Sequence, residues 1–260
     1  RDAFYAAIFD VDRIDRPGMD ATADGVMTTV YLREVVEDYH AQVVCGGRTV
    51  DHRHGCSGID GLTFGPFPGS SDGRDYLFVT YGVYSDLTRA DNDYQVILQY
   101  EIAELNAAAK PLDEADMHRF GVEKPRNKYY LYTGNTTYGV QNLEYDEFTG
   151  DYFACVYTGH KPQFPNYPMF VIDGGKAAEE KPLVGCGGET GRVLSLKETG
   201  EAKNGISGIN FPLGSMGVHS LGDGEFCFVD PVWDDPDNLS VNCVRYRLTG
   251  TDGKLAFIKV

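Results

Sequence analysis

Gly58-Ile59-Asp60-Gly61-Leu62 is the stretch that decides the fold, because two further stretches of the chain share its pattern. They are Gly139-Val140-Gln141-Asn142-Leu143 and Gly217-Val218-His219-Ser220-Leu221. In each, a glycine is followed by a β-branched residue, a polar residue, a small residue and a leucine. The three starts, at positions 58, 139 and 217, are about 80 residues apart. A pattern that returns at a nearly constant interval predicts that one structural unit recurs along the chain.

Apolar or alternating runs, separated by polar and glycine-rich turns, lie around these stretches and predict short β-strands. We divide the chain into four units, at residues 1–57, 58–138, 139–216 and 217–260. The predicted strands cover residues 3–11, 26–39 and 42–50 in the first unit, 59–64, 76–83, 94–105 and 128–133 in the second, 143–147, 152–158, 169–172 and 191–197 in the third, and 225–230, 241–248 and 254–260 in the fourth. One helical turn is expected, over residues 111–120. The sequence therefore predicts an all-β protein.

Units of four antiparallel strands resemble the blades of a β-propeller. The resemblance covers the whole chain and implies a single propeller domain over 1–260, with about four blades visible. Neither the WD dipeptide nor a kelch-type glycine pattern is present, so it identifies no specific family. The first blade lacks its inner strand, because nothing like the Gly58 stretch precedes Ala3. A β-sandwich with similar hairpins is the competing fold.

Charge limits the classes of partner. Asp and Glu number 39 against 23 Lys and Arg, which gives a net charge of −16. A chain this acidic repels phosphate backbones and anionic membranes, so we expect no nucleic-acid partner. No apolar run approaches the roughly 20 residues that span a bilayer, so no membrane insertion is expected. The partners that remain are a small molecule, a carbohydrate or another protein.

The cysteines and the first residue bear on the cellular compartment. Cys155 and Cys227 lie in apolar runs and are predicted to be buried thiols, whereas Cys45 and Cys56 are close enough in sequence for a disulfide. The chain opens at Arg1 with no initiator Met, which is typical of a piece of a longer product. These features do not determine the cellular compartment, and between the alternatives they favour a secreted or cell-surface protein.

The candidate site follows from propeller geometry. The polar residue of each quoted stretch lies at the start of the strand nearest the central channel. Asp60, Gln141 and His219 are therefore predicted to converge around one opening, from consecutive blades. The alternative is that these side chains only hydrate the channel or bind neighbouring backbone amides.

Loops on the same face add further polar side chains. Arg53 and His54 precede the first stretch, Tyr138 precedes the second, and the loop of the third unit carries His160 and Lys161. The predicted ligand-binding residues are Gln141, His160, Lys161 and Trp233. For Trp233, the only Trp, two interpretations are open: stacking against a flat ligand such as a sugar, or wedging between blades.

A divalent metal ion is the cofactor that this face would hold. His54, His219 and Asp60 form a mixed nitrogen and oxygen set of the kind that Zn²⁺ or Mn²⁺ accepts. The acidic loops around residues 12–24 and 86–93 would instead suit Ca²⁺, which prefers carboxylates and carbonyls. Solvated loop side chains are the alternative in both cases.

Two classes of function are consistent with this face. The first is a ligand-binding or interaction module. The second is a carbohydrate-active lyase or hydrolase, with His219 or His54 as the base, Asp60 as an acid or metal ligand, and Tyr138 and Arg53 assisting. The sequence contains no nucleophile elbow, phosphate-binding loop or zinc-protease motif, and we favour the binding module.

Overall fold

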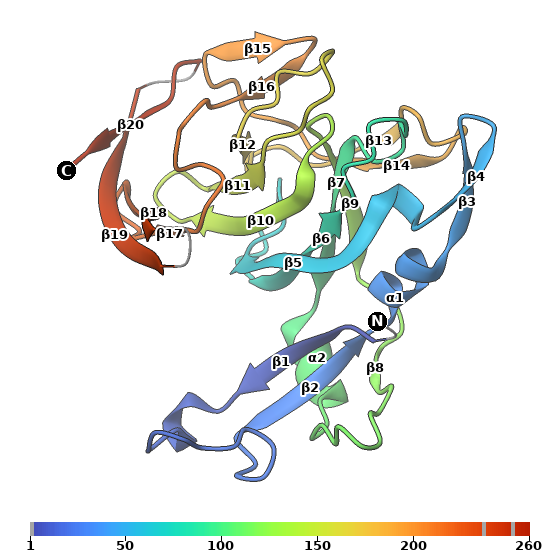
Figure 1. Ribbon diagram of the computed structural model, residues 1–260, viewed down its shortest axis with the longest axis vertical. Helices are drawn as coiled ribbons and strands as arrows, with labels where there is room; N and C mark the ends of the chain where they lie inside the picture. The colour runs from blue at the N-terminus through green and yellow to red at the C-terminus, as the bar shows by residue number, and fades with distance from the viewer. Residues whose placement is uncertain (1–2, 236–237, 251–252) are drawn as a thin grey trace.

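The computed structural model describes residues 3–235, 238–250 and 253–260, and these residues form a mostly antiparallel β structure (Figure 1). Four sheets follow one another along the chain, and two small hairpins lie beside them. The all-β prediction is confirmed. Among the described residues no sheet closes into a barrel, and the propeller remains a prediction.

The first sheet contains β1 (Tyr5–Phe9), β2 (Met27–Leu32) and the short β8 (Gly121–Val122). β1 and β2 pair antiparallel, as predicted, and the 3-10 helix η1 (Val11–Arg13) lies in the loop between them. β1 is an edge strand of this sheet, and the absence of an inner strand from a first propeller blade stays a prediction.

The prediction of one strand over residues 26–39 is wrong after Leu32, where helix α1 (Arg33–His40) begins. Val35 and Asp38, one helical turn apart, are both buried. The Tyr81 hydroxyl donates a hydrogen bond of 2.8 Å to Asp38 Oδ2. Burial of one helical face therefore outweighs the β propensity of the valines.

The single strand predicted over residues 42–50 is a hairpin of β3 (Gln42–Cys45) and β4 (Arg48–Asp51). Gly46 and Gly47 form its turn with φ of +57° and +77°. Two consecutive positive φ angles are typical of the tight turns that connect paired strands. The 3-10 helix η2 (Arg53–Gly55) then leads into the second sheet.

The second sheet begins with the four-stranded meander that the sequence predicts. Its strands are β5 (Cys56–Gly65), β6 (Tyr76–Val83), β7 (Tyr94–Tyr100) and β9 (Asn127–Tyr132). β7 is shorter than predicted, because helix α2 (Ile102–Ala108) replaces its last residues. Residues 111–120 contain no helix.

Two strands from later in the chain extend this sheet. β14 (Thr190–Val193) pairs parallel with β9, and β13 (Glu179–Pro182) pairs antiparallel with β14. The run at residues 191–197 was predicted as the last strand of the third unit. Instead it starts in the second sheet and reaches the third only near Leu196, which bridges Ile172.

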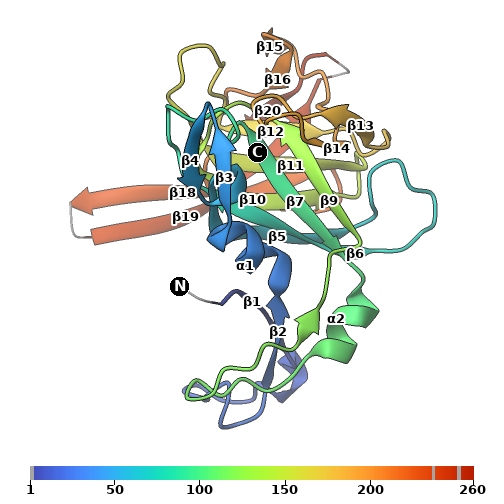
Figure 2. The same cartoon turned by 90° about the vertical axis from the view of Figure 1, so that its right-hand side faces the viewer.

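The third sheet contains β10 (Thr137–Asp146), β11 (Asp151–Tyr157) and β12 (Met169–Ile172). A hairpin of β15 (Glu201–Lys203) and β16 (Ile206–Gly208) follows it. The fourth sheet is an antiparallel meander, as predicted, of β17 (Val218–Ser220), β18 (Glu225–Asp235), β19 (Asn238–Thr249) and β20 (Ala256–Lys259). β18 and β19 continue beyond the sheet as a two-stranded ribbon (Figure 2).

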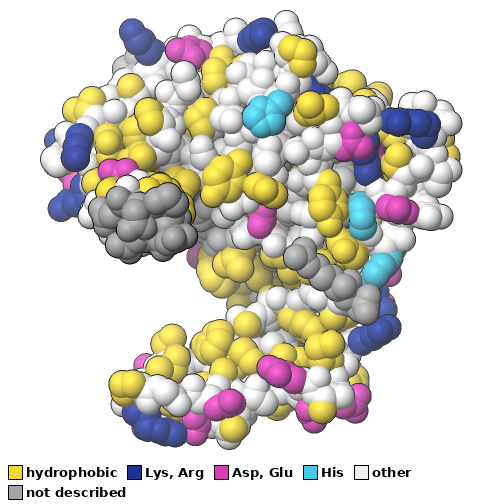
Figure 3. Space-filling model, in the orientation of Figure 1, with side chains coloured by type: hydrophobic (Ala, Val, Ile, Leu, Met, Phe, Trp, Pro, Cys, Tyr) yellow, Lys and Arg dark blue, Asp and Glu magenta, His cyan; other side chains and the backbone are white. Residues whose placement is uncertain are grey.

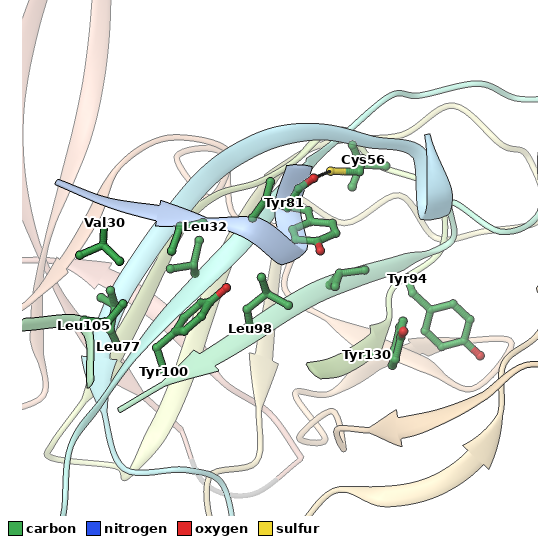
Figure 4. Packing of buried hydrophobic residues seen from close by; sticks show 14 of the residues in the cluster. Val30, Leu32, Cys56, Leu77, Tyr81, Tyr94, Leu98, Tyr100, Leu105 and Tyr130 are labelled. Carbon is green, nitrogen blue, oxygen red and sulfur yellow. Dashed lines mark hydrogen bonds between the residues drawn. The ribbon is translucent and has the colours of Figure 1, made fainter. Parts of the chain in front are cut away.

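Three hydrophobic clusters hold the four sheets together, one between each consecutive pair. They include Val30, Leu32, Val79 and Leu98 between the first and second sheets (Figure 4), Phe78, Ile97, Leu143 and Phe170 between the second and third, and Phe153, Val171, Phe226 and Phe228 between the third and fourth. The second and third sheets are thus covered on both faces. The sheets therefore follow one another in space in the order of their first strands, whereas β8, β13 and β14 join sheets that begin earlier in the chain.

The first strands of the second, third and fourth sheets lie side by side, with β10 between β5 and β17. The Val218 N–H donates to Asn142 Oδ1 at 2.6 Å, and the Tyr145 N–H donates to Thr63 Oγ1 at 3.4 Å. The first sheet stands apart from them as a lobe, and hydrophobic side chains line both walls of the hollow beside it (Figure 3). All three quoted stretches therefore fall on neighbouring strands.

Candidate functional site

Asp60 of β5 and Gln141 of β10 meet at the surface where the second and third sheets join. Gln141 Nε2 donates a hydrogen bond of 2.8 Å to Asp60 Oδ2. The two residues occupy the same position in their stretches, so the structure brings together two of the three polar residues that the sequence predicts to converge.

Two glycines allow this approach. Gly82 of β6 lies under Asp60, and a Cβ atom at position 82 would be 2.5 Å from Ser57 Oγ and 3.3 Å from Asp60 Oδ2. Gly139 has φ of +82°, and a Cβ atom there would be 2.4 Å from the Tyr81 carbonyl oxygen. The contact at Gly139 is with backbone, which cannot rotate away, so glycine is required at position 139, whereas a side chain at position 82 would displace Ser57 and crowd Asp60.

Tyr138 precedes Gly139 on β10, three residues before Gln141. Gly139 packs on the backbone of residues 81–83, the same piece of β6 that lies under Asp60. Tyr138 has φ of +66°, which is uncommon for an aromatic residue, and is 61% exposed. Its ring lies edge-on to Tyr157 at 5.8 Å between centroids. β10 thus carries a solvent-facing aromatic ring three residues before Gln141.

The Asp60 carboxyl is partly shielded from water although the residue as a whole is exposed. Burial raises its pKa to about 6, and the hydrogen bond from Gln141 acts in the opposite direction. This carboxyl therefore changes charge near neutral pH, and its oxygens can both accept and, when protonated, donate hydrogen bonds.

His219 of β17 does not join Asp60. Its Nδ1 lies 2.9 Å from Glu144 Oε1, and the Ser220 N–H donates to the same oxygen at 2.8 Å. His219 is exposed, and with Glu144 and Glu147 it lines an open pocket of about 270 Å³ between β10 and β17. The predicted convergence of three residues is thus replaced by two separate pairs along β10.

Arg53 and His54 lie away from these pairs, at the start of β5. The His54 ring is 1% exposed and contacts the Tyr130 hydroxyl at 3.4 Å. Arg53 lies 3.6 Å from Asp38 Oδ1 and 3.9 Å from Glu189 Oε1. Neither side chain is placed to share a ligand with His219.

The remaining predicted ligand-binding residues are scattered. Lys161 is buried and forms an ion pair with Asp93 at 2.5 Å, which fastens its loop to the second sheet. His160 beside it is exposed. Trp233 lies on the β18–β19 ribbon opposite Leu239 and is 62% exposed, so it does not wedge between sheets.

The described residues contain no group of three or more His, Cys, Asp or Glu side chains arranged to hold a metal ion. His54, His219 and Asp60 each have a different partner, and their combination is not supported as a metal site. In the first acidic loop, Asp24 accepts from Arg16 and from the Asp20 N–H. Those contacts satisfy carboxylates that a Ca²⁺ site would need.

The cysteine predictions divide. Cys155 is fully buried in β11, as expected, and Cys227 in β18 is half-buried. Cys45 and Cys56 form no disulfide, and all six thiols are free. Burial raises the pKa of Cys56 to about 12 within the first hydrophobic cluster.

Glu144, Glu189 and Cys186 are the polar partners that sequence reasoning missed. Each lies far in sequence from the histidine it contacts. Only Glu144 had a usable signal, because it follows the second quoted stretch on the same strand. A larger pocket, of about 500 Å³ between β16 and β20, contains none of the predicted residues.

Comparisons with protein-family models, with curated proteins and with solved structures find no match for this chain. No helix in the described ranges is long and apolar enough to cross a lipid bilayer.

Proposed function

We propose that this protein binds a polyhydroxylated ligand of the carbohydrate type on the surface formed by Asp60, Tyr138 and Gln141. The observation that carries the proposal is the Asp60–Gln141 hydrogen bond of 2.8 Å across two sheets, on a strand that also carries the exposed ring of Tyr138 three residues away. A carboxylate and an amide in fixed relative positions offer acceptors and donors to hydroxyl groups. The Tyr138 ring offers a flat apolar surface for the C–H face of a sugar.

The proposed architecture is a propeller whose first strands line a channel. Support comes from the second, third and fourth sheets, which pack one on the next and have their first strands, β5, β10 and β17, side by side. In a propeller this surface is the channel mouth, where ligands commonly bind.

The test is binding of the whole protein to a panel of neutral and uronic-acid oligosaccharides, measured by isothermal titration calorimetry. Tyr138→Ala and Gln141→Ala should each weaken binding by about tenfold or more. Phe148→Ala is the matched control, because this aromatic residue is 65% exposed on the β10–β11 turn. If Phe148→Ala weakens binding as much as Tyr138→Ala, or if no member of the panel binds, the proposal fails.

A second candidate function, a carbohydrate-active lyase or hydrolase, is favoured by the His219–Glu144 pair. A carboxylate at Nδ1 holds the proton on that nitrogen and leaves Nε2 as the base, facing the 270 Å³ pocket that Glu147 also lines. His219→Ala should then abolish release of reducing or unsaturated ends while leaving oligosaccharide binding intact. If wild type and His219→Ala bind oligosaccharide equally and wild type releases no such ends, the enzyme function is excluded and only the binding function remains.

A further inference from the structure

A second group of reactive side chains lies where the β13–β14 loop meets the start of β5. Cys186 Sγ is 3.9 Å from His54 Nδ1. The other ring nitrogen of His54, Nε2, is 3.7 Å from Glu189 Oε1 and 3.4 Å from the Tyr130 hydroxyl. A thiol, an imidazole and a carboxylate therefore lie in a row, although the histidine is more than 130 residues from the cysteine.

His54 is held in an unfavourable backbone conformation. Its φ is +54°, and those of His52 and Gly55 are +65° and +70°. The Arg89 guanidinium donates to the carbonyl oxygens of Asp51 and His52 at 2.6 and 2.7 Å, and it is buried. A turn that costs free energy in this way persists only because such bonds over-determine it. The consequence is an imidazole fixed under the Cys186 loop.

The loop that carries Cys186 is short and closed. The Leu183 N–H donates to the Glu189 carbonyl at 2.7 Å, so both ends meet. Gly187 and Gly188 follow the cysteine, and a Cβ atom at either would have no neighbour within 4 Å. Cys186 is half-buried and adjoins the open space at Gly187 and Gly188, from which a substrate carbonyl would approach the sulfur.

We infer that Cys186, His54 and Glu189 form a nucleophile, general base and positioning residue for acyl transfer from an ester or thioester. The Glu189 carboxylate, 3.7 Å from His54 Nε2, favours a proton on that nitrogen by charge, which leaves the Nδ1 lone pair facing the thiol. This arrangement is independent of the surface around Asp60 and Tyr138.

The reaction consumes only the ester or thioester and one water molecule. Sγ attacks the carbonyl carbon, an S–C bond forms, and the thiol proton passes to His54 Nδ1. The bond from the carbonyl carbon to the leaving oxygen or sulfur then breaks, and the leaving group takes that proton. Water attacks the resulting thioester on Cys186, gives one proton through His54 back to the sulfur, and a carboxylic acid is released.

The environment makes the histidine necessary. Burial, followed by the nearby carboxylates of Asp91 and Glu189, raises the pKa of Cys186 to about 12. The sulfur therefore carries its proton at neutral pH, and a base must remove that proton during attack. An unassisted thiol in this position would react more slowly than an exposed one.

The experiment uses p-nitrophenyl acetate with the whole protein and measures acetylation of each cysteine by peptide mass mapping. Cys243, which is exposed on β19, is the reference thiol within the same molecule. Cys186 should be acetylated about tenfold faster than Cys243 at neutral pH. The His54→Gln substitution should lower the acetylation rate at Cys186 by about a hundredfold. Cys186→Ser should abolish the fast phase of nitrophenolate release.

Because His54 is buried, Glu189→Gln provides a second variant at a residue that is 35% exposed. It should lower the rate at Cys186 by about tenfold and leave the rate at Cys243 unchanged, which a general loosening of the fold would not do. Phe148→Ala should be acetylated at the wild-type rate, and the assay contains no oligosaccharide, so failure here and failure of ligand binding are distinguishable. A wild-type rate at Cys186 no higher than at Cys243, or an unchanged rate in Glu189→Gln, overturns the inference.

Discussion

Replacement of Asp60 by Asn should stabilise the protein at pH 8 and not at pH 4. The carboxyl sits over Gly82 and loses part of its hydration on folding, which raises its pKa from 3.8 to about 6. The folded state therefore prefers the protonated form. Asn is neutral at every pH and keeps an oxygen that can accept the hydrogen bond from Gln141.

Proton linkage gives the direction in which the stability of the protein changes with pH. Because the folded pKa of this acid lies above its unfolded value, the ionised carboxylate costs stability at all pH values above about 6. That cost fades as pH falls from 6 towards 4, where the folded carboxyl is protonated. Asp60 is exposed along one edge, so water screens the charge, and we discount the cost to about 1 kcal/mol. For a chain of this length, that corresponds to a rise in Tm of about 2–4 °C.

The assay is a series of thermal unfolding curves for wild type and Asp60→Asn between pH 4 and pH 8. Asp12→Asn, in the exposed loop between β1 and β2, is the control for loss of one negative charge from an acidic protein. A gain of Tm that is the same at both pH values, or a loss at pH 8, would refute the reasoning. The same variant should bind oligosaccharide more weakly, since the Asn side chain offers one acceptor oxygen where the carboxylate offers two.

Two further predictions concern the contact of helix α1 with the second sheet and the contact of the fourth sheet with the third. Lys128→Met should lower the free energy of unfolding in urea by about 3–5 kcal/mol, because the lysine is mostly buried and pairs with Asp38 and, at 2.8 Å, with Glu34 of α1. Lys176→Met is the control: its side chain is 64% exposed, and the loss should be no more than about 0.5 kcal/mol. Equal costs for the two lysines would contradict the role of burial. Phe226→Ala should also cost about 3–5 kcal/mol, since its ring is fully buried against Phe153 at 4.9 Å between centroids. A cost below about 1 kcal/mol would show that the fourth sheet does not rest on the third.

Strand positions were accessible from the sequence wherever pairing is local. The meander of β5, β6, β7 and β9 and that of β17 to β20 follow from alternating or apolar runs joined by turns. Both helices were missed, because each is short and directly continues a strand whose apolar residues have high β propensity. The parallel pairing of β14 with β9 was also missed, since nothing local specifies a partner some 60 residues away.

The same distinction between local and long-range information applies to the candidate site. The sequence by itself determined that Asp60, Gln141 and His219 occupy equivalent places on the first strands of successive units, because a glycine-led pattern that recurs requires a recurring backbone. Only the tertiary structure decided their partners. β10 has irregular register between Thr137 and Asn142, and it lies between two sheets, so Gln141 reaches Asp60 whereas Glu144 reaches His219. Two side chains form a hydrogen bond only when their sheets pack at the right relative position. That position is set by the hydrophobic side chains packed between the sheets.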